Sequence, residues 1–488
     1  MTNHTTTAGS GKRRRTKIVT TLGPATDRPG VLEALLRAGA NIVRLNFSHG
    51  SAADHEQRVR AVRSLADKLG LPVGIMGDLQ GPKIRIGRFA GGPIELHPGD
   101  RLILDAGLDL GAGTREAVGL TYKDLPRDLT AGDVLLLDDG RIQLQTEGTD
   151  GCRVHTRVLV GGTLSDSKGI NKLGGGLSAP ALTDKDRADI RMASALDVDY
   201  MAVSFPRSGA DLHEARRLLQ EAGSQARIVA KIERAEAVAS EEAMRELILA
   251  ADAVMVARGD LGVEIGDARL MEVQKKLITL ARSLDRAVIT ATQMMESMIH
   301  APLPTRAEVM DVSNAVLDGT DAVMLSAETA SGEYPVETVQ AMAQVCAGAE
   351  TSVPNSRYRM ERVFDSAEEV IAFSSIFAAN HLRGINGLIV FTDSGRSPLL
   401  MSRLRTGLPI YAFSRHQRSV SWMCMDRGVY PFLFDNLAYP SHEELLHASV
   451  ALLCERGLVK SGDQLVSVFG VSMGHTGHTD SMRVITVS

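Results

Sequence analysis

Short apolar segments rich in valine and isoleucine recur along roughly the first 330 residues, and stretches with helical periodicity separate them. This alternation is typical of β-α units around a parallel sheet. Eight such units predict a closed (β/α)8 barrel, and a doubly wound open sheet is the alternative. The predicted strands are residues 17–23, 40–47, 72–79, 200–206, 227–233, 253–261, 287–294 and 322–329.

Polar side chains stand at the carboxyl ends of almost all the predicted strands. In a (β/α)8 barrel the loops after the strands build the active site at that face, so polar groups are expected there. An open sheet does not call for this pattern, and we therefore favour the barrel. The residues concerned are Arg44, Asn46, Asp78, Lys231, Glu233, Asp260, Thr292 and Glu328.

The regular spacing breaks between the third and fourth predicted strands, where roughly 120 residues intervene and a helix with its loops would need far fewer. Glycine-rich turns and short alternating segments fill this gap, and Asp139-Gly140 between two apolar runs is a hairpin signal. We therefore expect a small β-barrel domain inserted into the larger barrel. Near the end of the chain, helical and strand-like segments alternate again, which predicts a separate α/β domain.

Four units follow from this spacing. We expect a flexible tail at 1–15, a discontinuous catalytic barrel at 16–80 and 172–352, an inserted β lid domain at 81–171 and a C-terminal α/β domain at 353–488.

The composition of the 488 residues is ordinary for a globular protein, with 44% hydrophobic and 23% charged residues. No apolar run approaches the ~18 residues that a membrane-spanning helix needs. A formal net charge of -5 argues against nucleic acid as a main partner, and the basic run at 12–15 is expected to be a solvated tail. Four scattered cysteines without a C-x-x-C pair indicate free thiols in a reducing cytoplasm.

One local pattern carries the chemistry. Lys231 and Glu233 are two positions apart on a predicted strand, so both side chains point to the same side. A buried structural ion pair is one interpretation, but a second strand end brings Asp260 beside a pair of glycines. Two carboxylates beside a lysine suit a Mg²⁺ ion that keeps sites for substrate oxygens, and leave the lysine to face a transferred phosphoryl group.

These segments resemble the pyruvate kinases from about residue 15 to the last barrel strand. The matching motifs follow one another in order over about three hundred residues and include both borders of the insert. They are TKIVTTLGPAT at 16–26, VRLNFSHG at 43–50, GDLQGPKIR at 77–85, KGIN at 168–171, IVAKIERAE at 228–236, ARGDLGVE at 257–264, ATQMMESM at 291–298, PTRAEVMDVSNAV at 304–316 and DAVMLSAETASG at 321–332.

The resemblance implies transfer of a phosphoryl group from phosphoenolpyruvate to ADP, giving pyruvate and ATP. It also implies a cytoplasmic homotetramer. Glu233 and Asp260 would hold Mg²⁺ or Mn²⁺, and Lys231 would neutralise the charge of the transition state. Arg44 would bind the substrate phosphate and backbone near Gly259 its carboxylate.

Further residues would complete this active site. Thr292 would help deliver a proton to the enolate, through water. Asn46, His49, Arg85 and Lys168 resemble nucleotide contacts, and the two last residues stand at the roots of the insert. A small domain tethered there would close over the substrates and exclude water.

One segment departs from the relatives that require K⁺. The oxygen donors of a monovalent-cation pocket are present around Asn46, Ser48, Asp78 and Leu79. However, the loop that resembles D-T-K-G-P-E in K⁺-requiring enzymes reads D-L-Q-G-P-K here and places Lys83 where they have glutamate. We expect the tethered ammonium to replace K⁺, and the alternative is that it points to solvent.

The C-terminal domain contains a candidate effector site. A predicted strand at 388–391 leads into a loop at a helix start, where backbone N–H groups and the helix dipole favour phosphate. The resemblance implies a phosphorylated effector, and the stretch at 470–481 departs from the fructose-bisphosphate-activated type, so we expect a sugar monophosphate or AMP. An ordinary turn is the alternative. The loop residues are Thr392, Ser394, Gly395, Arg396 and Ser397.

Two other functions remain open at this point. Another phosphoenolpyruvate-using barrel, such as an aldolase or lyase, would share the acidic strand ends but would not predict the insert. A catalytically silent metabolite sensor would use the C-terminal domain, but the loss of Lys231, Glu233 or Asp260 would be expected, and all three are present.

Overall fold

The computed structural model describes residues 13–352, 363–470 and 479–488. Eight parallel strands close into a barrel in the order β1-β16-β15-β14-β13-β12-β3-β2, which confirms the predicted fold class. Their side chains are buried on both faces, as expected for strands covered by helices outside and packed side chains inside. The strands are β1 (Lys17–Thr21), β2 (Ile42–Asn46), β3 (Gly74–Asp78), β12 (Tyr200–Val203), β13 (Arg227–Ile232), β14 (Ala253–Ala257), β15 (Ala287–Ala291) and β16 (Ala322–Leu325).

Helices surround the barrel, and three of them begin with a capping box: Ser51 with Asp54, Thr183 with Asp186 and Thr305 with Glu308. The helical segments are α1 (Val31–Ala38), α2 (Ala52–Leu69), α4 (Asp184–Ala195), α5 (Gly209–Glu221), η1 (Glu236–Val238), α6 (Glu241–Ala250), α7 (Arg258–Ile265), α8 (Asp267–Ser283), η2 (Glu296–Ile299), α9 (Arg306–Asp318), α10 (Ala327–Ala330) and α11 (Pro335–Glu350).

All eight barrel strands end earlier than predicted, and the difference is largest where the chain turns into a helix. The chain enters helix α7 directly after β14 and helix α10 soon after β16, whereas the sequence suggested strands to residues 261 and 329. The reason is the period of the apolar residues: Leu261 and Ile265 are four positions apart and both buried, which is the spacing of a helix face. This turn into α7 brings Asp260 to the mouth of the barrel.

The insert is a mainly β domain with one short helix and its own hydrophobic core. Its main sheet has the order β11-β7-β8-β9-β5-β6, and β10 pairs with β4. Single bridges from Arg85 to Gly169 and from Ile86 to Leu120 link the two edges of this sheet, so it curls into a small barrel. The elements are β4 (Ile94–Leu96), β5 (Arg101–Asp105), β6 (Ala117–Gly119), α3 (Leu125–Asp128), β7 (Val134–Leu137), β8 (Ile142–Asp150), β9 (Arg153–Val160), β10 (Gly162–Leu164) and β11 (Ile170–Lys172).

The C-terminal domain is a five-stranded sheet of order β19-β18-β17-β20-β21, with a hydrophobic core on each face. Strand β21, which the sequence analysis missed, pairs antiparallel at the edge. The elements are α12 (Ala367–His381), β17 (Ile385–Phe391), α13 (Arg396–Arg403), β18 (Ile410–Ser414), α14 (Gln417–Met423), β19 (Val429–Leu433), α15 (His442–Glu455), β20 (Gln464–Phe469) and β21 (Ser481–Thr486).

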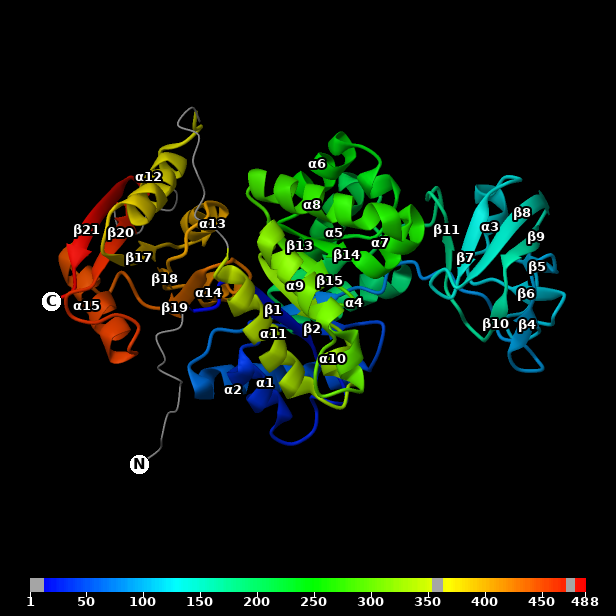
Figure 1. Ribbon diagram of the computed structural model, residues 1–488, viewed down its shortest axis with the longest axis horizontal. Helices are drawn as coiled ribbons and strands as arrows, with labels where there is room; N and C mark the ends of the chain where they lie inside the picture. Colours follow the sequence, from blue (N-terminus) through cyan, green and yellow to red (C-terminus); the bar gives the residue numbers. More distant parts are fainter. Residues whose placement is uncertain (1–12, 353–362, 471–478) are drawn as a thin grey trace.

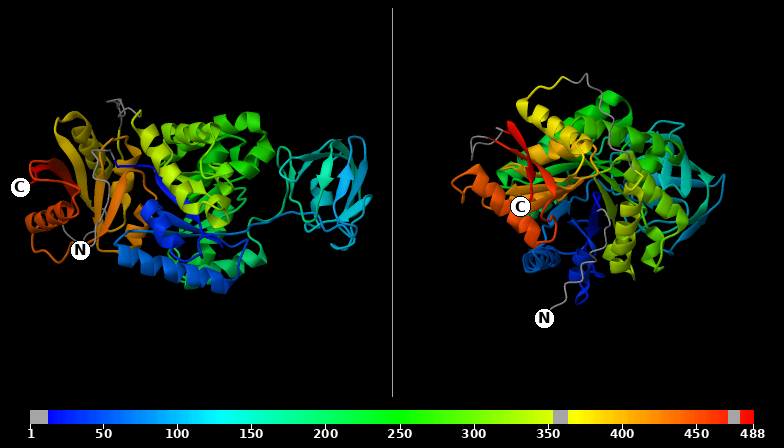
Figure 2. Two further views of the ribbon diagram at one scale, coloured as in Figure 1. Left: turned by 60° about the horizontal axis from the view of Figure 1, so that its bottom comes forward. Right: turned by 60° about the vertical axis from the view of Figure 1, so that its left-hand side comes forward.

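The three domains lie in a row, with the barrel between the insert and the C-terminal domain (Figures 1 and 2). The C-terminal domain closes the bottom of the barrel, because Cys424 and Met425 pack into the same hydrophobic cluster as the barrel interior. A buried ion pair between Arg403 and Asp321 reinforces this contact. No helix in the described part of the chain is both long and apolar enough to cross a membrane.

The flexible tail that we expected at 1–15 needs a correction at its end. The Arg15 side chain is buried, and its backbone N–H donates to Glu350 Oε2 at 2.8 Å. The neighbouring Arg14 donates to Asn41 Oδ1 at 3.0 Å. These contacts arise because the two arginines lie where the barrel meets the C-terminal domain and find buried acceptors there.

Candidate active site

Four charged side chains meet at the carboxyl ends of β2, β3 and β13. Lys231 Nζ lies 2.9 Å from Glu233 Oε1 and 3.3 Å from Asp78 Oδ1, and Asp78 also accepts from Arg44 Nε at 2.5 Å. Arg44 Nη1 donates to Thr21 Oγ1 at 3.0 Å, so the guanidinium is held by two of its nitrogens. The sequence analysis predicted all four charged residues at strand ends, and the structure brings them together.

Burial decides the charge state of this group. Burial alone would raise the pKa of Asp78, but the charges of Arg44 and Lys231 outweigh it and hold that pKa below its usual range. Burial raises the pKa of Glu233 to about 7, against the charge of Lys231 and with support from the negative charge of Asp260. Desolvation also raises the pKa of Asp260. Two carboxylates that disfavour their own ionisation create a place where a cation is stabilised.

The donor set at this place fits a hard divalent cation. Glu233 and Asp260 supply carboxylate oxygens, which Mg²⁺ and Mn²⁺ prefer, and few protein ligands leave positions for substrate. The second oxygen of Glu233 accepts from the Phe205 N–H at 2.8 Å, which fixes the carboxylate. Glu233 and Asp260 could therefore hold Mg²⁺.

Thr292 lies beside this group at the end of β15. Its Oγ1 accepts from the Gly259 N–H at 2.8 Å and donates to the Ala291 carbonyl at 2.6 Å. A Cβ added to Gly259 would lie 3.7 Å from Thr292 Oγ1, an ordinary contact distance, so the two residues are direct neighbours. The structure thus brings Thr292, Gly259 and Asp260 together, as the motifs suggested.

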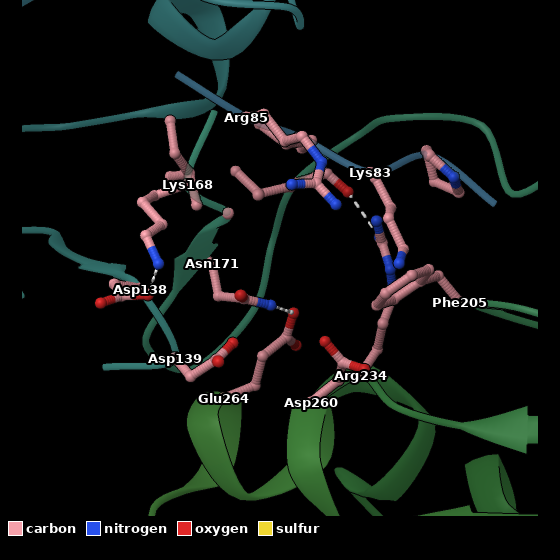
Figure 3. Close-up of a pocket in the computed structure, with 15 residues that line it drawn as sticks. Lys83, Arg85, Asp138, Asp139, Lys168, Asn171, Phe205, Arg234, Asp260 and Glu264 are labelled. Carbon is pink, nitrogen blue, oxygen red and sulfur yellow. Dashed lines mark hydrogen bonds and ion pairs between the residues drawn. The ribbon is translucent and has the colours of Figure 1, made fainter. Parts of the chain in front are cut away.

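A cavity of about 260 Å³ lies between the barrel mouth and the insert (Figure 3). Asp260 and Glu264 line it from the barrel, and Arg85 and Lys168 line it from the roots of the insert. Lys168 Nζ pairs with Asp138 Oδ1 at 2.7 Å, and Arg85 Nη1 donates to the Ser167 carbonyl at 2.7 Å. Arg85 and Lys168, two of the four predicted nucleotide contacts, therefore line one cavity between the barrel and the insert.

The other two predicted nucleotide contacts are Asn46, at the end of β2, and His49, on the loop after it, and neither lines this cavity. Desolvation and the positive charges of Lys83, Arg44 and Arg85 lower the pKa of His49. His49 therefore lies close to these basic side chains. Asn46 Oδ1 instead accepts from the Ser48 N–H at 3.1 Å, which shapes its own loop.

The predicted monovalent-cation pocket is partly filled by protein groups. The Asp78 carboxylate forms ion pairs with Arg44 and Lys231, and the Leu79 carbonyl accepts a hydrogen bond from Ser204 Oγ at 2.7 Å. Lys83 faces the cavity shared with Asp260 (Figure 3). The residue is exposed as a whole, but partial desolvation of its ammonium lowers the pKa of Lys83, against the charge of Asp260.

The predicted effector loop joins β17 to α13. Gly395 has a φ of 80° at the helix start, and its N–H donates to Thr392 Oγ1 at 2.9 Å. Ser397 Oγ donates to Glu368 Oε1 at 2.6 Å, and Arg396 Nε lies 3.2 Å from Glu368 Oε2. The buried carboxylate of Glu368 thus occupies two of the predicted phosphate contacts, Ser397 and Arg396. Most of the predicted covering stretch, at 471–478, lies outside the described residues.

The sequence analysis missed several residues of the site. Ser204 accepts from Lys231 Nζ at 2.6 Å, and Arg234 lines the cavity while donating to the Leu177 carbonyl at 2.8 Å. Glu264 accepts from the Ala235 N–H at 2.8 Å, and burial raises the pKa of Glu264 to about 7. Ser204 follows β12 and Arg234 follows β13, so the strand-end pattern could have found both.

Comparison with known proteins agrees with this geometry. Residues 13–339 match the family model for the pyruvate kinase barrel domain, and residues 369–485 match that for the pyruvate kinase alpha/beta domain. Pyruvate kinase II of Salmonella typhimurium is 58% identical over 480 residues, which cover 98% of this chain and 100% of the relative. Pyruvate kinase of Haemophilus influenzae is 57% identical, covering 97% and 98%. Pyruvate kinase of Mycobacterium tuberculosis is 40% identical, covering 96% and 98%. The chain belongs to the pyruvate kinase family.

Proposed function

We propose that the chain transfers the phosphoryl group of phosphoenolpyruvate to ADP, giving pyruvate and ATP, in a Mg²⁺- or Mn²⁺-dependent reaction of the cytoplasm. One observation carries the proposal: the Lys231 ammonium lies between Glu233 and Asp78 at the mouth of the barrel. Beside it, Asp260 lines a cavity bounded by the basic roots of the insert. The family membership supports the same reaction.

Glu233 and Asp260 are the residues that would hold the divalent cation. When bound, the cation neutralises the charge of the substrate oxygens and orients them. Lys231 supplies a second positive charge, at the transferring phosphoryl group. Its ammonium donates to Ser204 Oγ and forms ion pairs with Glu233 and Asp78, so a phosphoryl oxygen competes with these groups for the ammonium.

Arg44 binds the phosphate of the substrate. Asp78 and Thr21 hold its Nε and Nη1 atoms, and within the described residues Nη2 has no hydrogen-bond partner, so Nη2 can donate to a ligand. Preorganised positive charge of this kind stabilises the charge that spreads over the equatorial oxygens in phosphoryl transfer.

Thr292 and Gly259 act on the three-carbon part of the substrate. The Gly259 backbone can approach the carboxylate because no side chain is in the way. The Thr292 hydroxyl is a poor acid, so we infer that it orients a water molecule that protonates the enolate at C3. Its bonds to the Gly259 N–H and to the Ala291 carbonyl fix the hydroxyl oxygen for this role.

The nucleotide binds between the domains. Arg85 and Lys168 bind its phosphates, and Asn46 at the end of β2 and His49 on the following loop contribute further contacts. Because Arg85 and Lys168 belong to the insert, the phosphates draw this domain toward the barrel and exclude water from the reaction. The pair between Lys168 and Asp138 must open for this contact.

The reaction does not require K⁺ in this proposal. Lys83 and Asp260 line the same cavity, and the negative charge of Asp260 favours the charged form of the Lys83 ammonium. A cation attached to the chain therefore already lies near the phosphoryl-transfer site. Asn46, Ser48, Asp78 and Leu79 provide the oxygen-rich surroundings that a bound K⁺ would otherwise occupy.

A phosphorylated metabolite, a sugar monophosphate or AMP, activates the enzyme through the loop of Thr392, Ser394, Gly395, Arg396 and Ser397. Two contacts support this regulation. Arg227, the first residue of β13, donates to the Ser394 carbonyl at 3.0 Å and lies over the Trp422 ring. Arg227 begins β13, and Lys231 lies near the end of the same strand. A movement of the effector loop would therefore act on the strand that carries the catalytic lysine.

We also propose a homotetramer. The segment from Leu303 to the end of α9 exposes three large apolar side chains, with Leu303 74%, Met310 69% and Leu317 43% exposed. A contact with a second copy would cover them. Light scattering should give a mass about four times the 52.3 kDa of one chain.

A coupled assay tests the proposed reaction. Phosphoenolpyruvate, ADP and Mg²⁺ are mixed with the protein, and lactate dehydrogenase reports pyruvate through NADH oxidation. We expect pyruvate formation that depends on ADP and on Mg²⁺. Pyruvate formation without ADP would favour a lyase or phosphatase, and the absence of any signal would favour a metabolite sensor.

A further inference from the structure

Arg258 follows β14 directly and lies beneath the active-site loops of the barrel. Its side chain is 7% exposed. Nη2 donates to the Thr292 carbonyl at 2.8 Å, and Nε lies 3.3 Å from both the Ala291 and the Thr292 carbonyls. One guanidinium therefore joins the strand end before Asp260 to the strand end that carries Thr292.

The backbone that Arg258 holds has a rare conformation. Thr292 has a φ of 70° and Gln293 a φ of 54°, so two successive non-glycine residues lie in the left-handed region. For a β-branched residue such as threonine this conformation is strained, and it persists only where the surroundings enforce it. The carbonyl bonds from Arg258 are such an enforcement, because they fix the peptide groups on both sides of Thr292.

Two outer helices of the barrel, α9 and α8, hold the Arg258 guanidinium in place. Nη1 donates to Asp311 Oδ1 on α9 at 2.7 Å and lies 3.5 Å from Gln274 Oε1 on α8. A planar guanidinium has several donors and can bond to the strand-end carbonyls and to Asp311 at the same time, whereas an ammonium cannot reach all of these acceptors. A helix of the outer layer thus positions, through Arg258, a residue of the active site.

We propose that Arg258 is a positioning residue for the protonation step, acting through Thr292. This inference rests on the proposed function. In that step the C2=C3 electron pair of enolpyruvate forms a bond from C3 to a proton of the ordered water, the O–H bond of that water breaks to leave hydroxide, and the enolate oxygen becomes the pyruvate carbonyl. Arg258 holds the Thr292 hydroxyl beside Gly259 and Asp260, so its loss displaces the water but leaves Lys231, Glu233 and Arg44 in place.

The variant Arg258→Lys tests the proposal because it keeps the positive charge and removes the branched set of guanidinium N–H donors. Two rates are measured: kcat for pyruvate formation, and exchange of the pyruvate methyl protons for deuterium in D₂O with Mg²⁺ and ATP, followed by NMR. We expect both rates to fall about 100-fold while KM for phosphoenolpyruvate changes by less than about threefold. Exchange within about threefold of wild type, in a folded variant, would overturn the proposal.

Two further variants keep the outcome clear. Arg15→Lys alters an equally buried arginine at the opposite end of the barrel and should leave the exchange rate unchanged. If Arg258→Lys fails to fold, Asp311→Asn tests the same support from outside, with an expected fall in exchange of about tenfold, and unchanged exchange would overturn the proposal. A wild-type protein without kinase activity would contradict the proposed function, whereas an active wild type with unaffected variants overturns only the role of Arg258.

Discussion

Lys231 Nζ lies 2.9 Å from Glu233 Oε1, and the two residues are two positions apart at the carboxyl end of β13. The same ammonium lies 3.3 Å from Oδ1 of Asp78, at the end of β3. The charges of Asp78 and Glu233 overcome the effect of burial and raise the pKa of Lys231. The site therefore keeps a buried positive charge ready before substrate binds.

The first prediction concerns this charge. Lys231→Met keeps most of the side-chain volume and removes the ammonium. We expect kcat for pyruvate formation to fall about 1,000-fold, because a preorganised charge aimed at the phosphoryl group is lost. Lys276→Met, on the exposed face of α8, is the matched control and should keep wild-type activity. A Lys231→Met enzyme within tenfold of wild type would assign the catalytic charge elsewhere.

The second prediction concerns pH and Mg²⁺. Below about pH 7 the metal-free protein holds a proton on Glu233, and a divalent cation must displace it. We therefore expect the Mg²⁺ affinity to fall about tenfold per unit as the pH drops below 7 and to level off above it. Calorimetry in buffers of different ionisation enthalpy measures the released proton. An affinity that is constant from about pH 5.5 to 8 would contradict this assignment.

The third prediction concerns K⁺. Wild-type activity in tetramethylammonium buffer should change by less than about twofold when K⁺ is added, because Lys83 already supplies a positive charge. Lys83→Glu should lose activity about tenfold and regain it with K⁺. Lys123→Glu makes the same charge change at an exposed position of the insert and serves as the control. A wild-type enzyme that K⁺ activates strongly would show that Lys83 does not replace the ion.

The fourth prediction concerns Glu368, which binds Ser397 and Arg396 where we expect the effector phosphate. A carboxylate there repels an incoming phosphate and competes for its donors. Glu368→Gln should therefore tighten the binding of glucose 6-phosphate or AMP about tenfold, as measured by calorimetry. Ser394→Ala combined with Arg396→Ala should weaken it. Unchanged binding in both variants would place the effector site elsewhere.

The barrel was predictable from sequence because its strands are buried on both faces and read as unbroken apolar runs. The same logic failed after β14 and β16, where apolar residues continue into helices α7 and α10. Strand β21 was missed because it lies at the edge of its sheet, and Met482 and Val484 are 40% and 43% exposed. An edge strand with exposed apolar residues has no alternating pattern of burial to detect.

The charged centre of the site was predictable for a different reason. Lys231 and Glu233 follow the period of a strand, so their common direction can be read from spacing alone. Contacts between distant segments cannot be read in this way. The bond from Ser204 to Lys231, the link from Arg258 to Thr292 and the packing of Met425 beneath the barrel all depend on the folded arrangement.

The most direct test of the account follows phosphorus itself. The purified protein is mixed with phosphoenolpyruvate, ADP and Mg²⁺, and ³¹P NMR records the fate of the phosphoryl group, with Lys231→Met as the control. We predict that the phosphoenolpyruvate signal disappears as the γ-phosphate signal of ATP grows by the same amount, and that the control is nearly inactive. Conversion to inorganic phosphate, or no conversion at all, would contradict the central claim.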